Sequence, residues 1–189
     1  MTAIVNFSKT ISPSMDILIS SNLERLLYHI TNDATKVKSY MEKLQSTGCY
    51  QVDEATLIAI QETFSAGYLD DSATKKCIHD IYQQDNYVAD THTAVAWQVA
   101  QDYQKSTQDK TPMVILSTAS PYKFSDSVLS ALGEDISDKD EFALLDKLST
   151  LNKDKIPQGL AQLQSLPILH NNLCAKEDMI KAVNTFLNI

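Results

Sequence analysis

A short apolar run ends in a group of hydroxyl side chains and a lysine. Residues 113–116 are apolar, and Ser117, Thr118, Ser120 and Lys123 follow closely. A hydroxyl group both donates and accepts a hydrogen bond, so Ser117 or Thr118 could bind a heterocyclic nitrogen, whereas Ser120 or Lys123 could bind an anion. In the alternative interpretation, these residues only form a turn in which their hydroxyls bond to local backbone.

A histidine lies near the start of a predicted helix. His92 stands in the stretch DTHTAV, where Asp90 can cap the helix. The positive end of the helix dipole disfavours the imidazolium cation, which suits a neutral hydrogen-bonding role. The alternative is a histidine that only takes part in the capping turn. The other histidines lie in unrelated contexts without ligand spacing, so we expect no metal site.

The segment KTISPSMDI, residues 9–17, gathers a second set of polar side chains. Ser12, Ser14 and Asp16 lie around Pro13, which restricts Ser12 to an extended conformation. We interpret the segment as an extended stretch that leads into a turn. No serine has a histidine and an aspartate in a recognisable order, and no carboxylate pair is placed for acid–base chemistry. The local patterns therefore indicate no catalytic residue.

The elements that must position these residues begin with one predicted strand. Met113–Ser117 is a continuous apolar run that starts after Pro112, and this pattern is typical of a parallel strand buried on both faces. A helix capped by Ser125 and closed by Gly133 is expected to follow the turn. Because open α/β sheets bind ligands at the carboxyl ends of their strands, Thr118 is the first candidate for a ligand contact.

The predicted sheet lacks convincing further strands. Short runs at residues 4–7, 17–20 and 166–169 could be strands. The backbone amides and carbonyls of a buried strand need hydrogen-bonding partners. We therefore expect either a minimal sheet or a piece of a larger α/β protein whose other strands lie elsewhere. If the edge of the strand is open, the chain should self-associate through it.

Helical spacing of apolar residues dominates the rest of the chain. Helices are expected over residues 20–30, 33–48, 53–67, 71–82, 90–103, 125–132, 138–150, 157–165 and 176–189. Residues 31–86 could form a helical subdomain. The predicted fold class is therefore α/β and helix-rich, with one parallel strand and a few short ones.

Composition argues against several classes of partner. The 189 residues carry a formal net charge of −8 without an offsetting basic patch, which disfavours nucleic acid and anionic membranes. No apolar run approaches the roughly 20 residues of a membrane-spanning helix, so we expect a cytoplasmic protein. Cys49, Cys77 and Cys174 are far apart and are interpreted as reduced, mostly buried thiols. The four glycines stand alone, so this chain offers no glycine-rich loop for a phosphate.

Three separated stretches of the chain resemble bacterial threonine synthase. They are SPSMDILISSNLERLL at residues 12–27, DTHTAVAW at 90–97 and ILSTASPYKF at 115–124, in the order found in the C-terminal half of that family. The resemblance covers nearly the whole chain. It implies the tryptophan synthase β-like fold, which is PLP fold type II. It also implies a lyase that uses pyridoxal 5'-phosphate to convert O-phospho-L-homoserine and water to L-threonine and phosphate.

The same resemblance implies a role for Thr118. This residue matches the one that binds the pyridine nitrogen of the cofactor, within a strand, turn and helix at residues 113–133 that face it. Some members of the family have histidine where this chain has Ser120, so no histidine role is transferred there. Relatives commonly have proline at the position of Thr91, so His92 is assigned only to the vicinity of the site. The residues placed in that vicinity are Ser12, Ser14, Asp16, His92, Ser117, Ser120 and Lys123.

The family's Schiff-base lysine and glycine-rich phosphate loop lie in its N-terminal half, and no lysine of this chain has a comparable context. The resemblance therefore implies a C-terminal fragment that is not catalytic by itself and binds no pyridoxal phosphate alone. Its expected partners are the missing N-terminal half and the small-molecule substrate. Two alternatives stay open, namely a stand-alone helical protein that binds a ligand or partner, and one chain of a split threonine synthase.

Overall fold

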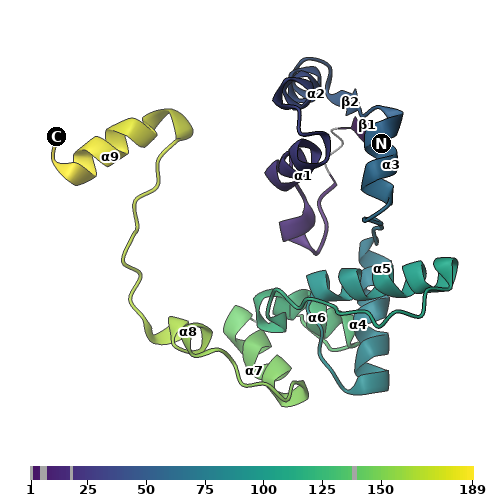
Figure 1. Cartoon of the computed structure of the whole chain (residues 1–189). Helices are drawn as coiled ribbons and strands as arrows, with labels where there is room; N and C mark the ends of the chain where they lie inside the picture. Colours follow the sequence, from purple (N-terminus) through teal and green to yellow (C-terminus); the bar gives the residue numbers. More distant parts are fainter. Residues whose placement is uncertain (1, 5–7, 18, 138–139) are drawn as a thin grey trace. The chain divides into compact units, whose positions relative to one another are not determined.

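The computed structural model describes residues 2–4, 8–17, 19–137 and 140–189. The chain forms two compact units, residues 1–155 and residues 156–189. Helices dominate both of them (Figure 1).

The first unit combines a short strand pair with a series of helices, among which η denotes a 3-10 helix. Its elements are β1 (Thr2–Ile4), η1 (Pro13–Met15), α1 (Ser21–Thr31), α2 (Ala34–Thr47), β2 (Cys49–Gln51), α3 (Glu54–Gln61), α4 (Asp71–Asp85), α5 (Thr91–Thr107), η2 (Pro121–Phe124), α6 (Ser125–Ala131) and α7 (Glu141–Leu151).

Capping side chains begin most of the predicted helices. In α1, α2, α3, α4, α5 and α7, the N-cap side chain accepts a hydrogen bond from the backbone N–H three residues further on. Such a bond satisfies one of the amides that have no partner within the helix. The caps are Ser20, Asp33, Asp53, Asp70, Asp90 and Asp140. The presence of the corresponding predicted helices is therefore confirmed, whereas residues 138 and 139, with which one of them was expected to begin, lie outside the described residues.

Two glycines near predicted helix ends have different roles. Gly48 follows α2 with a φ of 74°, a left-handed conformation that suits glycine, and it ends the helix as predicted. The predicted end of the next helix near Gly67 is wrong, because α3 ends at Gln61. A Cβ at Gly67 would lie 3.0 Å from both Cγ atoms of Val99 in α5. Gly67 therefore permits a close approach between segments.

The turn before α6 also differs from the prediction. Ser125 is not a side-chain cap, because η2 runs directly into α6. Its hydroxyl instead donates to the carbonyl oxygen of Tyr122 at 2.9 Å. Ser120 caps η2, since its Oγ accepts the Tyr122 N–H at 3.3 Å. Gly133 follows α6 with a φ of 80°, as expected for a residue that closes a helix.

One hydrophobic core joins α1, α2, β2 and α3. Its buried side chains are Leu27, Val37, Tyr40, Leu44, Tyr50, Val52 and Ile60. The hydroxyl of Tyr40 donates to Asp53 Oδ2 at 2.9 Å, and Lys36 Nζ lies 2.5 Å from the same oxygen. The hydrogen bond from Lys36, together with the Thr56 N–H, holds the pKa of Asp53 well below its ordinary value.

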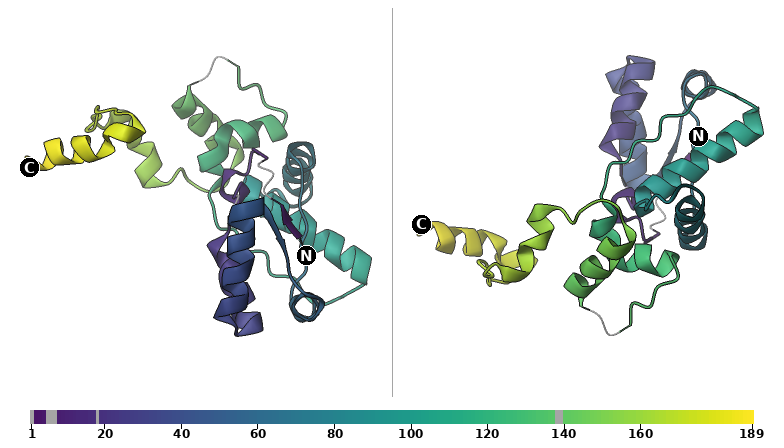
Figure 2. Two further views of the ribbon diagram at one scale, coloured as in Figure 1. Left: turned by 90° about the horizontal axis from the view of Figure 1, so that it is seen from above. Right: turned by 90° about the horizontal axis from the view of Figure 1, so that it is seen from below.

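A second group of buried side chains joins α4, α5, α6 and α7. Helix α4 contacts α5 and α6, and α6 contacts α7, as the views in Figures 1 and 2 show. The thiol of Cys77 in α4 donates to the carbonyl oxygen of Ala94 at 3.3 Å, and burial raises the pKa of this thiol to about 11. Cys49 is only partly buried and Cys174 is exposed, so the prediction of mostly buried thiols is wrong. The grouping of residues 31–86 as a subdomain stays a prediction. The buried apolar residues of this group include Cys77, Ile78, Ile81, Ala94, Val128, Leu129, Leu144 and Leu148.

The sheet differs most from the prediction. Within the described residues the strands are β1 and β2, which pair antiparallel with Ala3 opposite Tyr50. The prediction of a buried parallel strand at Met113–Ser117 is wrong. This segment is irregular, and Val114 and Leu116 are 85% and 72% exposed. A strand needs hydrogen-bonding neighbours, and no segment in the described part of the chain supplies them.

The structure also differs from the prediction at the shorter runs that were expected to form strands. Residues 166–169 are irregular and exposed, so this prediction is wrong. Residues 17, 19 and 20 form no strand, and residue 18 lies outside the described residues. In the run 4–7, Ile4 belongs to β1, while residues 5–7 lie outside the described part.

The second unit contains short helical elements and an amphipathic helix. They are α8 (Gln158–Ala161), η3 (Leu163–Ser165), η4 (Lys176–Asp178) and α9 (Met179–Leu187). The helix expected over residues 157–165 is split between α8 and η3. In α9 the apolar Ile180, Val183 and Phe186 are all more than half exposed. No helix in the described parts of either unit is long and apolar enough to cross a membrane.

The first core predicts a large effect of truncating Leu27, whose side chain is fully buried. Leu27→Ala should lower the free energy of unfolding by about 2–5 kcal/mol, because the deletion leaves a cavity. Urea denaturation followed by circular dichroism measures this loss. The matched control is Ile58→Ala in α3, where the side chain is 51% exposed and the loss should stay below about 1 kcal/mol. Equal losses of unfolding free energy in the two variants would contradict the placement of Leu27 in this core.

The depressed pKa of Asp53 predicts a contribution to acid unfolding. Because the folded state binds the proton less readily than the unfolded chain does, the carboxylate stabilises the fold above about pH 4, and this contribution is lost as the pH falls below that value. Asp53→Asn should therefore show a shallower decline in melting temperature between about pH 5 and pH 2 than the parent chain. If the melting temperatures of the variant and the parent chain instead differ by the same amount at every pH in that range, this role of Asp53 is contradicted.

Candidate functional site

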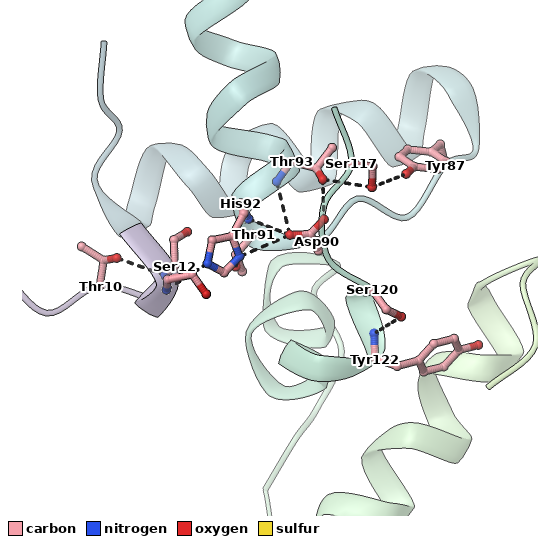
Figure 3. A network of polar contacts seen from close by, with 11 residues as sticks. Thr10, Ser12, Tyr87, Asp90, Thr91, His92, Thr93, Ser117, Ser120 and Tyr122 are labelled. Carbon is pink, nitrogen blue, oxygen red and sulfur yellow. Dashed lines mark hydrogen bonds and ion pairs between the residues drawn. The ribbon is translucent and has the colours of Figure 1, made fainter. Parts of the chain in front are cut away.

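The buried carboxylate of Asp90 organises the polar residues at the start of α5 (Figure 3). Asp90 is completely buried. Its Oδ1 accepts the backbone N–H groups of His92 at 2.9 Å and Thr93 at 3.3 Å, and its Oδ2 accepts a hydrogen bond from the Thr93 hydroxyl. A buried carboxylate is stable only when its oxygens are hydrogen-bonded, and the helix N-terminus supplies the required donors.

The hydroxyl of Thr93 links α5 to the run that precedes Thr118. Thr93 Oγ1 and Ser117 Oγ lie 3.1 Å apart, and the hydroxyl of Tyr87 donates to Ser117 Oγ at 3.4 Å. Because Asp90 accepts the single hydroxyl proton of Thr93, the Ser117 hydroxyl acts as the donor toward Thr93. The hydrogen bonds thus run from Tyr87 through Ser117 and Thr93 to the buried carboxylate.

Thr118 follows this anchored serine and is exposed. Its hydroxyl makes no hydrogen bond to any described residue. The preceding Ser117 is anchored through its hydroxyl, whereas the Thr118 hydroxyl is not engaged. This side chain is therefore available to a ligand as both donor and acceptor.

His92 connects the same helix end to the segment at residues 10–16. Its Nε2 accepts the backbone N–H of Ser14 at 3.1 Å, so this nitrogen carries no proton. In the neutral ring the proton then lies on Nδ1, which is 3.3 Å from both Asp90 Oδ1 and Thr91 Oγ1. The ring is buried and lies 4.8 Å from the ring of Phe124, centroid to centroid. Its role in this structure is to fix Ser14.

Asp16 and Ser12 shape the segment rather than joining the contacts of Asp90. Asp16 accepts hydrogen bonds from the backbone N–H of Thr10 at 2.7 Å and from its hydroxyl at 2.8 Å. The Ser12 N–H donates to Thr10 Oγ1 at 3.0 Å. The Ser12 hydroxyl is buried and has no partner among the described residues. An open cavity of about 830 Å³ lies beside this segment and the start of α4, and its lining does not include Thr118.

Ser120 and Lys123 lie beyond Thr118 in the turn. The Ser120 hydroxyl is used as the cap of η2, which is the local role that the alternative interpretation gave it. Lys123 is exposed, and its Nζ lies 5.9 Å from the centre of the Phe124 ring. The structure therefore brings Ser14, His92 and Ser117 together around Asp90, whereas Ser12, Asp16 and Ser120 bond locally.

The roles of Tyr87, Asp90 and Thr93 in this arrangement were not predicted from the sequence. Asp90 was recognised as a helix cap, and a hydroxyl residue three positions later is the pattern that could have indicated its bond to Thr93. Tyr87 gave no local signal, because its contact with Ser117 spans 30 residues. In the described ranges, no group of three or more histidine, cysteine or acidic side chains could hold a metal ion.

Comparisons with known proteins identify the family of this chain. The family "Threonine synthase, C-terminal" matches residues 93–183. The human protein threonine synthase-like 1 is 37% identical over 170 residues, which is 88% of this chain and 20% of that protein. Threonine synthase from Saccharomyces cerevisiae is 33% identical over 176 residues, which is 83% of this chain and 31% of that enzyme.

Two solved structures are similar over most of the chain. The PLP-bound threonine synthase from Brucella melitensis has a TM-score of 0.74 and 31% sequence identity, over 98% of this chain and 35% of that protein. Threonine synthase from yeast has a TM-score of 0.67 and 29% identity, over 86% of this chain and 33% of that protein.

The chain spans less than a third of the length of the human and Saccharomyces cerevisiae relatives. The matched family description and the sequence resemblance both refer to the C-terminal part of the enzyme. The chain therefore belongs to the threonine synthase family and corresponds to the C-terminal portion of its members.

Proposed function

We propose that this chain is the C-terminal part of a pyridoxal-phosphate-dependent threonine synthase and contributes Thr118 to the cofactor site. The intact enzyme would convert O-phospho-L-homoserine and water to L-threonine and phosphate. The observation that carries the proposal is the Thr118 hydroxyl, which is exposed and unpaired among the described residues although the adjoining Ser117 is anchored. This placement suits a contact with a ligand that another part of the enzyme binds.

The chemistry of Thr118 fits the pyridine nitrogen of the cofactor. A hydroxyl donates a hydrogen bond to an unprotonated ring nitrogen and keeps its own proton, whereas a carboxylate partner would favour the protonated ring. Bound pyridoxal phosphate would supply the electron sink for the elimination and the addition of water. Thr118 would orient the ring and hold its nitrogen in the neutral form.

The surrounding residues would position Thr118 rather than react. Ser117 holds the backbone next to it through Thr93, and His92 holds Ser14 on the other side of the same helix end. Ser12, Asp16, Ser120 and Lys123 are proposed to lie in the vicinity of the site. Among these, the exposed ammonium group of Lys123 is suited to an anionic group.

The N-terminal portion of the enzyme is the proposed partner of this chain. The lysine that carries the cofactor and the glycine-rich loop for its phosphate are expected there, since the four glycines of this chain stand alone. By itself the chain is proposed to be inactive and to bind no cofactor. Its location in the cytoplasm stays a prediction.

The role of Thr118 predicts a selective effect on cofactor affinity. The chain would be co-produced with the N-terminal portion of the Brucella melitensis enzyme, and pyridoxal phosphate binding would be followed by absorbance. Thr118→Val should weaken binding roughly tenfold, because it removes one hydrogen bond and leaves the volume almost unchanged. Thr118→Ser keeps the hydroxyl and should bind within about threefold of the parent. Equal affinity of the valine variant would reject the assignment.

The proposed absence of the cofactor lysine predicts the behaviour of the chain alone. Incubation with pyridoxal phosphate, reduction with borohydride and mass spectrometry should show no stoichiometric adduct on a single lysine, because each lysine lacks the site that would bind the phosphate. Scattered, substoichiometric labelling of exposed lysines is the expected background. A stoichiometric adduct at one lysine would show that the chain carries a cofactor lysine after all.

A further inference from the structure

A cavity lies between residues 8–17 and residues 67–74, which include the start of α4. It has a volume of about 830 Å³, and Val95 of α5 contributes to its lining. The two walls are joined where the backbone N–H of Ile11 donates to Asp71 Oδ1 at 3.0 Å. Pockets that hold small organic molecules have volumes of roughly 300–1,000 Å³, so this cavity has the size of a small-molecule site.

The hydroxyl of Ser12 is the unusual feature of this cavity. Ser12 is 3% exposed and belongs to the lining, and its Oγ has no hydrogen-bonding partner among the described residues. The backbone of the same residue is satisfied, because its N–H donates to Thr10 Oγ1 at 3.0 Å (Figure 3) and its carbonyl oxygen accepts the Met15 N–H at 2.8 Å. Buried hydroxyls are nearly always hydrogen-bonded, and one without a partner destabilises the fold. A partner for the Ser12 hydroxyl is therefore expected inside the cavity.

The charged side chains around the cavity favour a cation. Three aspartates, Asp16, Asp70 and Asp71, line it together with one lysine, Lys9. In the described part of the chain, Lys9 forms no ion pair with any of these carboxylates. Three carboxylates against one ammonium group leave the lining with a net negative charge. A positively charged ligand is attracted by this charge, whereas an anion is repelled.

Two carboxylate oxygens at the start of α4 have no bonding partner among the described residues. Asp70 Oδ1 caps the helix by accepting the Ala73 N–H at 2.7 Å, and Asp71 Oδ1 accepts the Ile11 N–H. The Oδ2 atoms of both aspartates accept no hydrogen bond from a described residue. Together with Ser12 Oγ they make three unpaired acceptors in the lining residues, and an ammonium group donates three protons.

Large side chains with exposed apolar surface complete the lining. Met15, Ile17 and Tyr68 are 49%, 61% and 91% exposed. A ligand with an apolar body would remove part of this surface from water, and the face of the Tyr68 ring attracts a cation. The lining therefore suits an ammonium group that is carried on a hydrocarbon chain.

We propose that this cavity is a binding site for a small organic cation with a primary ammonium group. The ammonium group would donate to Ser12 Oγ and to the carboxylates of Asp70 and Asp71. The hydrocarbon chain of the ligand would cover apolar surface of Met15 in the same lining. Thr118 does not line the cavity, so this site and the proposed role of Thr118 can fail separately.

An anion is the less suitable occupant, although the cavity adjoins a helix N-terminus. The amides at such an end attract anions, and their partial positive charge amounts to about half an elementary charge. Here the carboxylates of Asp70 and Asp71 already lie at that end, and the Ala73 amide is bonded to Asp70. The phosphorylated substrate of the proposed enzyme is therefore a poor occupant of this cavity.

Binding of hexylammonium to the full chain gives the first test. Amide chemical shifts in NMR spectra should saturate during a titration, with the largest changes at Ile11 and Ala73, whose amides bond to the two carboxylates. Hexan-1-ol has the same hydrocarbon chain without the charge, and hexanoate reverses the charge, so both should bind at least about tenfold more weakly. The absence of a saturable change, or equal binding of either control, would overturn the proposal.

A charge variant tests whether the carboxylate of Asp71 acts locally. Asp71→Asn removes the charge and keeps an oxygen that accepts the Ile11 N–H, and it should weaken hexylammonium binding at least about threefold. Asp126→Asn is the matched control, because Asp126 is also an exposed aspartate in the first turn of a helix, α6, and lies outside the cavity lining. Equal weakening by both variants would show that only the overall negative charge attracts the cation, which contradicts the site.

The Ser12 hydroxyl should affect binding and stability in opposite directions. Ser12→Ala removes an unpaired buried polar group, so the melting temperature of the chain without ligand should stay equal or rise. The same variant should weaken hexylammonium binding about tenfold, because one hydrogen bond to a charged group is lost. A lower melting temperature would show that the hydroxyl already has a partner within the chain, and unchanged affinity would show that it does not contact the ligand. Either result overturns the assignment.

The co-produced complex with the N-terminal portion of the Brucella melitensis enzyme gives the last test. A segment of that portion is the competing occupant of the cavity, and it would displace hexylammonium. In the complex the affinity for hexylammonium should stay within about threefold of that of the chain alone. Loss of saturable binding in the complex would identify the N-terminal portion as the occupant and overturn the proposal, whatever Thr118→Val does to cofactor affinity.

Discussion

The hydrogen bonds to the buried carboxylate of Asp90 are the interaction on which the candidate site depends. A carboxylate without exposure to water is stable only if nearby donors satisfy it, and α5 supplies these donors at its N-terminus. The same carboxylate orders Thr93 and lies beside the ring of His92. Thr93 holds Ser117, and His92 holds Ser14, so one helix end fixes two segments that are far apart in sequence.

The rest of the first unit supports this helix end. Helix α5 packs on α4, whose buried Cys77 thiol bonds to the carbonyl oxygen of Ala94, two residues from His92. Gly67 lets its segment approach Val99 further along α5. The core of α1, α2 and α3 has its own polar anchor, in which Asp53 joins Lys36 and Tyr40. Each group thus combines apolar burial with an aspartate that begins a helix.

Local chemistry explains why the helices were predictable and the sheet was not. Ser20, Asp33 and Asp53 each bond to an amide three residues away, so the signal for a helix start lies within a few positions of sequence. A strand at Met113–Ser117 requires partners that the described chain does not contain, so its composition predicted a pairing that this chain cannot make. The bond between Ser14 and His92 spans 78 residues and left no local pattern either.

For the candidate site, the residue types were predictable from the sequence, but the contacts between them were not. Ser117 and His92 were identified as residue types able to bond a ligand, and the structure shows that their polar groups are occupied by anchoring contacts. Thr118 keeps an unengaged hydroxyl. The most direct measurement is a crystal structure of the co-produced complex with pyridoxal phosphate. Thr118 Oγ1 should lie about 2.8 Å from the pyridine nitrogen, and a carboxylate or any other residue at that nitrogen would contradict the proposed role of Thr118.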